Sequence, residues 1–94
     1  MKIIETEPFK IQRDAIVWYI AKDKKSAALN FAKELKQIVN NLKSFPYKYR
    51  PSKYYKDDSI RDMIFNGYTI VYRVKEEKNI IEVLVIFNKN LPAA

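Results

Sequence analysis

The sequence predicts an α+β domain of element order β-α-α-β-β-β, with an antiparallel pair of helices packed on one face of a sheet. Apolar residues recur at helical spacing in the first half of the chain, and strand-length hydrophobic runs fill the second half. A polar, tyrosine-rich segment separates the two halves. Because the chain has 94 residues, 48% of them hydrophobic, one domain over residues 1–94 is expected and two independent cores are not.

The N-terminal residues are expected to form a short strand followed by a helix. Lys2–Thr6 is apolar at its centre, and Pro8 suits the first turn of a helix beginning at Thr6 or Glu7. From position 9 to about 21, apolar side chains recur at helical spacing: Phe9, Ile16, Tyr19 and Ile20, with Trp18 widening the stripe. The polar run 22–25 interrupts this pattern, and Asp23 is expected to be the N-cap of a second helix.

The second helix has the clearest periodicity in the chain. Its apolar residues follow one another at steps of four and three, which places them on one face: Phe31, Leu35, Ile38, Leu42 and Phe45. Pro46 is expected to end this helix at about Ser44 or Phe45. Since the break between the two helices is short, they should form an antiparallel hairpin.

Residues 46–59 are expected to form a loop, and they contain four tyrosines and four basic residues in fourteen positions. Three strands should follow, at Ile60–Phe65, Tyr68–Val74 and Ile80–Phe87, with Asn66-Gly67 as a tight turn. The last run is apolar on both faces, so it should be central in the sheet or covered by helices. These strands together predict an antiparallel meander.

Composition limits the chemistry. The chain has no Cys, which excludes disulfides and thiolate metal sites, and no His, the usual general base at neutral pH. Neither a cofactor nor a metal is therefore expected. The net charge of +7 favours nucleic acid, a ribosome or an acidic protein segment, although it could also serve solubility alone. The N-terminus lacks a signal-peptide core, and the longest apolar runs, Ala15–Trp18 and Val83–Phe87, cannot span a bilayer, so a cytoplasmic protein is expected.

Residues 60–74 read IRDMIFNGYTIVYRV, and this block resembles the RelE/ParE superfamily of type II toxin–antitoxin toxins. In that superfamily an IRD strand leads through a turn into a GYxIVYRV strand. The final strand, the helical hairpin and the Tyr/Arg loop also fit, so the resemblance covers nearly the whole chain. It implies a toxin that a co-encoded antitoxin neutralises. The oligomeric state is left open between a homodimer and a toxin–antitoxin hetero-oligomer; a sheet edge with few charges, or the Trp18 face of the first helix, could support a dimer.

The members of this superfamily act in different ways. RelE-like toxins cleave messenger RNA on the ribosome, whereas ParE-like toxins poison DNA gyrase. Cleavage requires a base for the 2′-hydroxyl and cations for the phosphate, which RelE-like members supply from lysines and arginines on the sheet. Aligned on the GYx segment, Thr69 stands where an arginine is expected, Ile60 and Asp62 where lysines are, and Lys89 where an arginine is. The resemblance therefore favours a non-enzymatic, gyrase-directed toxin over a ribosome-dependent endoribonuclease. A degenerate, non-toxic antitoxin-binding module is the third reading.

The candidate residues for binding the target or the partner are mainly cations: Lys48, Arg50, Lys53, Lys56, Arg61, Arg73, Lys89 and Trp18. In a ribonuclease the catalytic set would be Lys53, Lys56, Arg61, Arg73 and Lys89. Each has a structural alternative. The loop tyrosines could cover the edge of the core while the cations are solvated. Arg61 could form an ion pair with Asp57, Asp58 or Glu82, and Arg73 could form a surface pair, with Glu82 as its candidate partner. Tyr68 and Tyr72 are expected to be packing residues, and Trp18 to lie either in the core or in a patch that the antitoxin covers.

Overall fold

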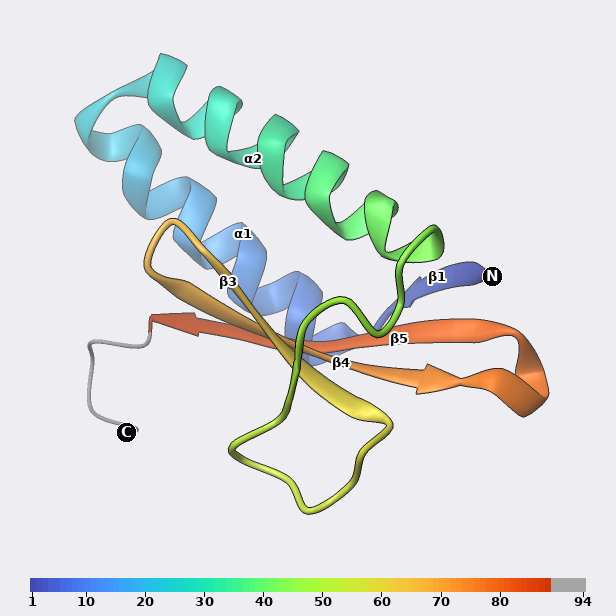
Figure 1. The fold of residues 1–94 in the computed structure, drawn as a ribbon. Helices are drawn as coiled ribbons and strands as arrows, with labels where there is room; N and C mark the ends of the chain where they lie inside the picture. The colour runs from blue at the N-terminus through green and yellow to red at the C-terminus, as the bar shows by residue number, and fades with distance from the viewer. Residues whose placement is uncertain (89–94) are drawn as a thin grey trace.

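The computed structural model describes residues 1–88 and has two helices on one face of a five-stranded sheet (Figure 1). The predicted fold class is confirmed. The elements, in chain order, are β1 (Lys2–Glu5), α1 (Glu7–Asp23), α2 (Lys25–Asn40), the 3₁₀ turn η1 (Asn41–Lys43), β2 (Arg50–Pro51), β3 (Ile60–Phe65), β4 (Tyr68–Lys75), the 3₁₀ turn η2 (Glu76–Lys78) and β5 (Ile80–Asn88).

Helix α1 begins where the sequence predicts, because Thr6 caps it. The Thr6 hydroxyl accepts a hydrogen bond from the Phe9 N–H at 3.3 Å and donates one to the Leu84 carbonyl at 2.8 Å, so it also ties the helix to β5. The expectation for the other end was wrong: Asp23 is the last residue of α1 rather than the N-cap of α2. Lys24 alone, in an extended conformation, separates the two helices and makes no side-chain capping bond.

The apolar face of α2 is buried largely as predicted. Phe31, Leu35 and Leu42 lie in the core, and Ile38 is partly buried against it. Phe45 was expected on the same face but is 65% exposed. The reason is that the helical winding ends with η1 at Lys43, so Phe45 lies beyond the helix and the helical periodicity no longer determines its direction.

The sheet has the strand order β1-β5-β4-β3-β2. Strands β3, β4 and β5 form the predicted antiparallel meander, and β1 pairs parallel with β5, so β5 is internal as its apolar character predicts. The expected loop contains one further strand, because Arg50 and Pro51 pair with Asp62 and Arg61 of β3. A proline is tolerated here because β2 lies at the edge of the sheet, where its missing N–H leaves no partner unpaired.

The side chains of the sheet divide into two faces. Met63, Ile70 and Tyr72 point toward the helices and belong to the core together with Phe9. Tyr72 is fully buried, and its hydroxyl donates to the carbonyl of Pro46 at 2.7 Å. Because burial disfavours the charged phenolate, the pKa of this phenol is raised. Tyr68 packs on the same face, which confirms the prediction that these two tyrosines are packing residues.

Candidate functional site

The face of the sheet opposite the helices, called the open face below, carries the positions where a RelE-like nuclease would need cations. On it Ile60 lies beside Arg73, Asp62 beside Val71, and Ile64 beside Thr69. Most of these side chains are buried even though no helix covers them, and Thr69 and Val71 have no exposed surface. Another part of the chain must therefore cover this face.

The segment 46–59 provides that cover. The Lys53 N–H donates to a carboxylate oxygen of Asp62 at 2.9 Å, which fixes the segment beside β3. The ring of Tyr54 meets the ring of Phe87 on β5 edge to face, with centroids 5.2 Å apart. Since β3 and β4 lie between β2 and β5, this contact reaches across both strands. Thr69, the register partner of Phe87, is fully buried.

Asp62 itself is buried and pairs with a cation of the loop. The Arg50 guanidinium lies 3.6 Å from the carboxylate oxygen that also accepts the Lys53 N–H. Within residues 1–88, the other oxygen of Asp62 has no hydrogen-bond partner. The acid that occupies an expected lysine position thus anchors the loop instead of facing a groove.

Arg61 acts within the fold as well. It shares the helix-facing side of β3 with Met63, as predicted, and its guanidinium donates to two backbone carbonyls, that of Asp58 at 2.9 Å and that of Tyr49 at 3.1 Å. The same guanidinium lies 4.9 Å from the ring centroid of Tyr47. Of the two alternatives for Arg61, the ion pair with a carboxylate is not formed among residues 1–88, where two of its N–H groups donate to loop carbonyls instead.

Arg73 forms the ion pair that the sequence suggested. Its guanidinium lies 3.7 Å from Glu82 on the neighbouring strand, and Lys75 lies 3.1 Å from the same carboxylate oxygen. All three side chains are partly buried. Glu82 therefore neutralises part of the positive charge at this end of the open face.

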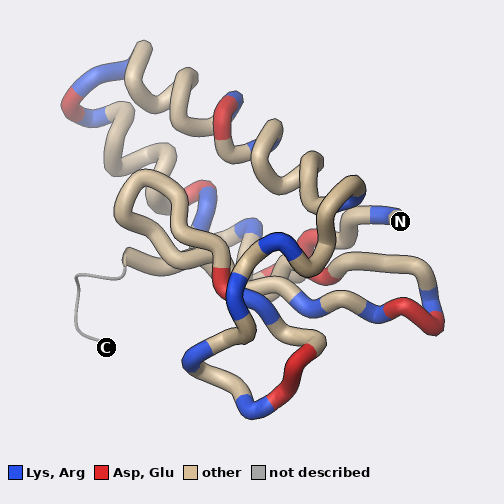
Figure 2. Tube along the Cα trace, in the orientation of Figure 1, with Lys and Arg blue, Asp and Glu red and all other residues tan. Residues whose placement is uncertain are grey.

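The remaining cations of the candidate set are dispersed. Lys53 and Lys56 are exposed and have no ion pair among residues 1–88, and Lys48 lies 5.5 Å from the ring centroid of Tyr49. Lys89 falls outside the described residues. Figure 2 shows basic residues along the loop, the helical hairpin and the sheet rather than in one cluster. The structure does not bring the predicted nuclease set together over the part it describes.

Trp18 lies on the outer side of α1. It is 63% exposed, with the ammonium of Lys22 lying 4.0 Å from its ring centroid, so its predicted alternative place in the core is wrong. Tyr19, expected on the buried stripe, is 72% exposed. Ile11 is also exposed, and the steps from Ile11 to Ala15 and Trp18 are four and three, which was the available signal for this second apolar stripe.

A groove of about 490 Å³ lies between α1 and the end of the sheet, beside this stripe. Ala15, Ile16 and Tyr19 line one wall, and Tyr68 and Phe87 line the other. Such a concave, mostly apolar surface next to an exposed tryptophan is typical of a protein-binding site.

The acidic residues were also compared with the requirements of a metal site. Among residues 1–88 the acidic side chains form no group of three that could hold a metal ion. Asp57, one of two adjacent aspartates, accepts hydrogen bonds from the Ser59 N–H at 2.9 Å and the Ser59 hydroxyl at 2.6 Å. These bonds lower the pKa of the Asp57 carboxyl and hold the turn that leads into β3.

Residues 3–90 match the family described as the ParE toxin of the type II toxin–antitoxin system parDE. The chain belongs to the ParE toxin family. The fold agrees: a solved structure titled "Chromosomal ParDE TA system from P. aeruginosa" superposes with a TM-score of 0.76 and 22% sequence identity, over 94% of this chain and 95% of that one. No protein of curated function matches the chain. Residues 1–88 of this ParE-family chain contain no helix with the length and apolar character needed to cross a membrane.

Proposed function

We propose that this ParE-family chain is an active toxin that a co-encoded antitoxin neutralises, and that its target is DNA gyrase rather than messenger RNA on the ribosome. The observation that supports this choice of target is that the segment 46–59 covers the open face of the sheet. Thr69, Ile60 and Asp62 occupy the positions where the nuclease type would need cations, and all three are buried.

The chemistry of RNA cleavage supports this choice. A nuclease needs a base within reach of the 2′-hydroxyl and cations around the phosphate, in a surface that the RNA can enter. Here the loop covers that surface, and Arg50, Arg61 and Arg73 are engaged by Asp62, by backbone carbonyls and by Glu82. A gyrase poison needs a binding surface instead, for which the exposed cations Lys53 and Lys56 are available.

The proposed antitoxin site is the outer stripe of α1. Ile11, Trp18 and Tyr19 expose apolar surface there beside the groove that ends at Phe87. Burying aromatic side chains in such a site contributes much of the affinity in protein complexes, and the net charge of +7 attracts an acidic partner. Toxin and antitoxin would meet in the cytoplasm, where the target also lies.

The test is inducible expression of the chain in bacteria with three measurements side by side: growth, plasmid supercoiling and messenger RNA integrity by primer extension. We expect growth arrest, loss of gyrase supercoiling and intact transcripts, and we expect co-expression of the neighbouring antitoxin frame to restore growth. Trp18→Asp is the matched variant for the antitoxin site. It should keep toxicity but lose rescue, since the side chain is exposed and contributes little to the core.

Each part of the proposal can fail separately. Cleavage of transcripts within codons on the ribosome would overturn the gyrase target. Undisturbed growth despite accumulation of folded protein would overturn the active toxin, and full rescue of Trp18→Asp would remove the α1 stripe from the antitoxin site.

A further inference from the structure

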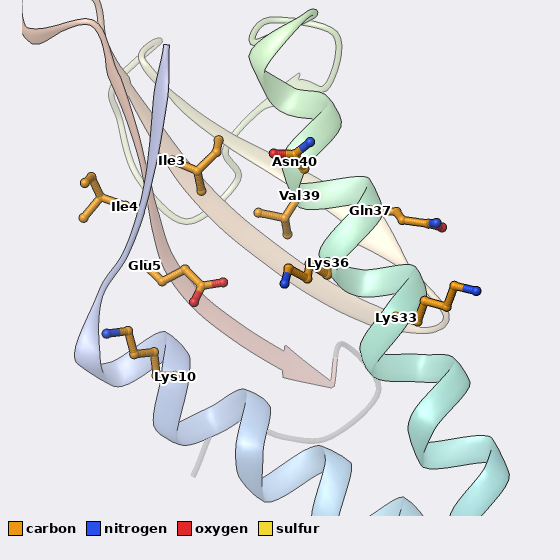
Figure 3. Close-up of a pocket in the computed structure, with 9 residues that line it drawn as sticks. All are labelled: Ile3, Ile4, Glu5, Lys10, Lys33, Lys36, Gln37, Val39 and Asn40. Carbon is orange, nitrogen blue, oxygen red and sulfur yellow. The ribbon is translucent and has the colours of Figure 1, made fainter.

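A groove of about 810 Å³ runs between strand β1 and helix α2 (Figure 3). Ile3 and Glu5 of β1 form one side, and Lys33, Lys36 and Val39 of α2 form the other. Ile3 packs against the core and Val39 belongs to it, so the groove has an apolar part between the two elements. It is separate from the α1 stripe and from the open face.

Strand β1 is an edge of the sheet, because it pairs with β5 and with no other strand among the described residues. The N–H groups of Lys2 and Thr6 bond to carbonyls of the β5 side, at 3.0 and 3.1 Å. Successive residues of a strand direct their backbone groups to opposite edges. The N–H and C=O groups of Ile3 and Glu5 therefore point away from β5, where another strand can pair with them.

The charges of the groove are not balanced. Figure 3 shows Lys36 extending from α2 toward β1, whereas the side chain of Lys33, one turn earlier, lines the groove but points away from β1. Neither lysine has an ion pair among residues 1–88. The carboxylate of Glu5 forms its ion pair with the Arg13 guanidinium, at 2.9 Å. The groove thus combines unpaired strand edge, apolar surface and uncompensated positive charge.

We propose that this groove takes an extended, acidic segment of the antitoxin, which adds a strand to the sheet beside β1. Pairing with Ile3 and Glu5 supplies backbone hydrogen bonds, while acidic side chains contact Lys33 and Lys36. A second copy of this chain is the less suitable occupant, because two chains of charge +7 repel each other. The inference rests on the proposed antitoxin and adds where, and in which conformation, part of it binds.

The first test isolates the strand edge with a matched pair at one position. Glu5→Pro removes the N–H that points into the groove, and Glu5→Ala removes the same side chain, including its pair with Arg13, but keeps the N–H. We expect Glu5→Pro to bind purified antitoxin roughly tenfold more weakly than Glu5→Ala. In wild-type protein, antitoxin should slow hydrogen exchange at the Ile3 and Glu5 amides.

The second test isolates the charge. We expect the double variant Lys33→Glu, Lys36→Glu to weaken antitoxin binding by about tenfold or more, and less so at high salt. The control Lys24→Glu, Lys25→Glu makes the same change in net charge outside the groove and should bind within about twofold of wild type. A short blocked peptide of alternating Glu and Val, used in place of antitoxin, should protect the same two amides, and its Lys-Val counterpart should not.

The outcomes separate the two proposals. Antitoxin binding that is unchanged in all groove variants, with unaltered exchange at Ile3 and Glu5, overturns the groove and leaves the toxin–antitoxin pair intact. Absence of any binding partner overturns both. If Glu5→Pro abolishes self-association in sedimentation but leaves antitoxin affinity unchanged, the groove is an interface between copies and the proposal fails.

Discussion

Replacing Asp62 by alanine is expected to destabilise the protein by roughly 1.5–4 kcal/mol. The side chain is completely buried, and its carboxylate accepts the Lys53 N–H at 2.9 Å, a bond to a charged group that contributes about 1.5–3 kcal/mol. The pair with Arg50, at 3.6 Å and with the arginine partly exposed, adds only about 0–1 kcal/mol. The hydrogen bond to the loop thus dominates the expected loss.

An opposing effect makes the sign of this change informative. One oxygen of Asp62 is buried without a hydrogen-bond partner within residues 1–88, so part of the desolvation cost of the carboxylate is not offset. Removing the carboxylate recovers that cost. We expect the loss to prevail, because alanine also leaves the Lys53 N–H without its acceptor beneath the folded loop.

The assay is urea denaturation followed by far-ultraviolet circular dichroism, since Trp18 is largely exposed and its fluorescence reports little on the core. Each kcal/mol should lower the Tm by roughly 4–8 °C in a domain of this size. Hydrogen exchange at the Lys53 amide should accelerate at the same time. Asp58→Ala is the control, because that exposed neighbour should change stability by less than about 0.5 kcal/mol.

A stability equal to or above that of the wild type would refute this reasoning. It would mean that the desolvation cost of Asp62 exceeds its contribution to anchoring the loop. If the Lys53 amide also kept its protection, the cover of the open face would have to be assigned to the contact between Tyr54 and Phe87.

Three further predictions concern single contacts. Burial raises the pKa of Tyr72 above its unfolded value of about 10. The contribution of the neutral phenol to stability is therefore complete below about pH 10 and is lost progressively as the pH rises from there toward the raised pKa of the folded protein. In urea titrations Tyr72→Phe should lose about 1 kcal/mol at neutral pH but decline less steeply in alkali, and equal slopes would contradict this. Thr6→Ala should cost about 1–2 kcal/mol in the same titration, and Thr6→Ser, which keeps the capping hydroxyl, should recover most of it. Gly67 adopts φ 83° and has open space where the methyl group of an alanine would lie, so Gly67→Ala should lower stability by about 1–2 kcal/mol through the backbone alone, and a neutral result would show that the turn can relax.

The elements and most of their order follow from the sequence, because short-range patterns determine them. The steps of four and three from Phe31 to Leu42 identify the buried face of α2, and Asn66-Gly67 identifies the turn between β3 and β4. The continuous apolar run of β5 correctly predicts a strand with neighbours on both sides. The local geometry of a helix, strand or turn is enough to read each of these.

The sequence alone could not assign the outer side of α1. Apolar residues occur on more than one side of that helix, so periodicity does not decide which side is buried. The placement of Phe9 in the core and of Trp18 and Tyr19 in solvent depends on how α1 crosses β5, to which it is bound through Thr6 and Leu84, 78 positions apart in the chain. Such a contact leaves no signal in local spacing.

The candidate site shows the same division. The substitutions at Thr69, Ile60 and Asp62 could be read directly from the sequence, and they already argued against nuclease chemistry. The tertiary structure decided what the neighbouring cations do. Arg61 bonds to the carbonyl of Tyr49, Lys53 presents its backbone rather than its ammonium to Asp62, and the loop closes the face on which a nuclease would act. These roles depend on backbone groups brought together by folding, and backbone groups are the same in every sequence.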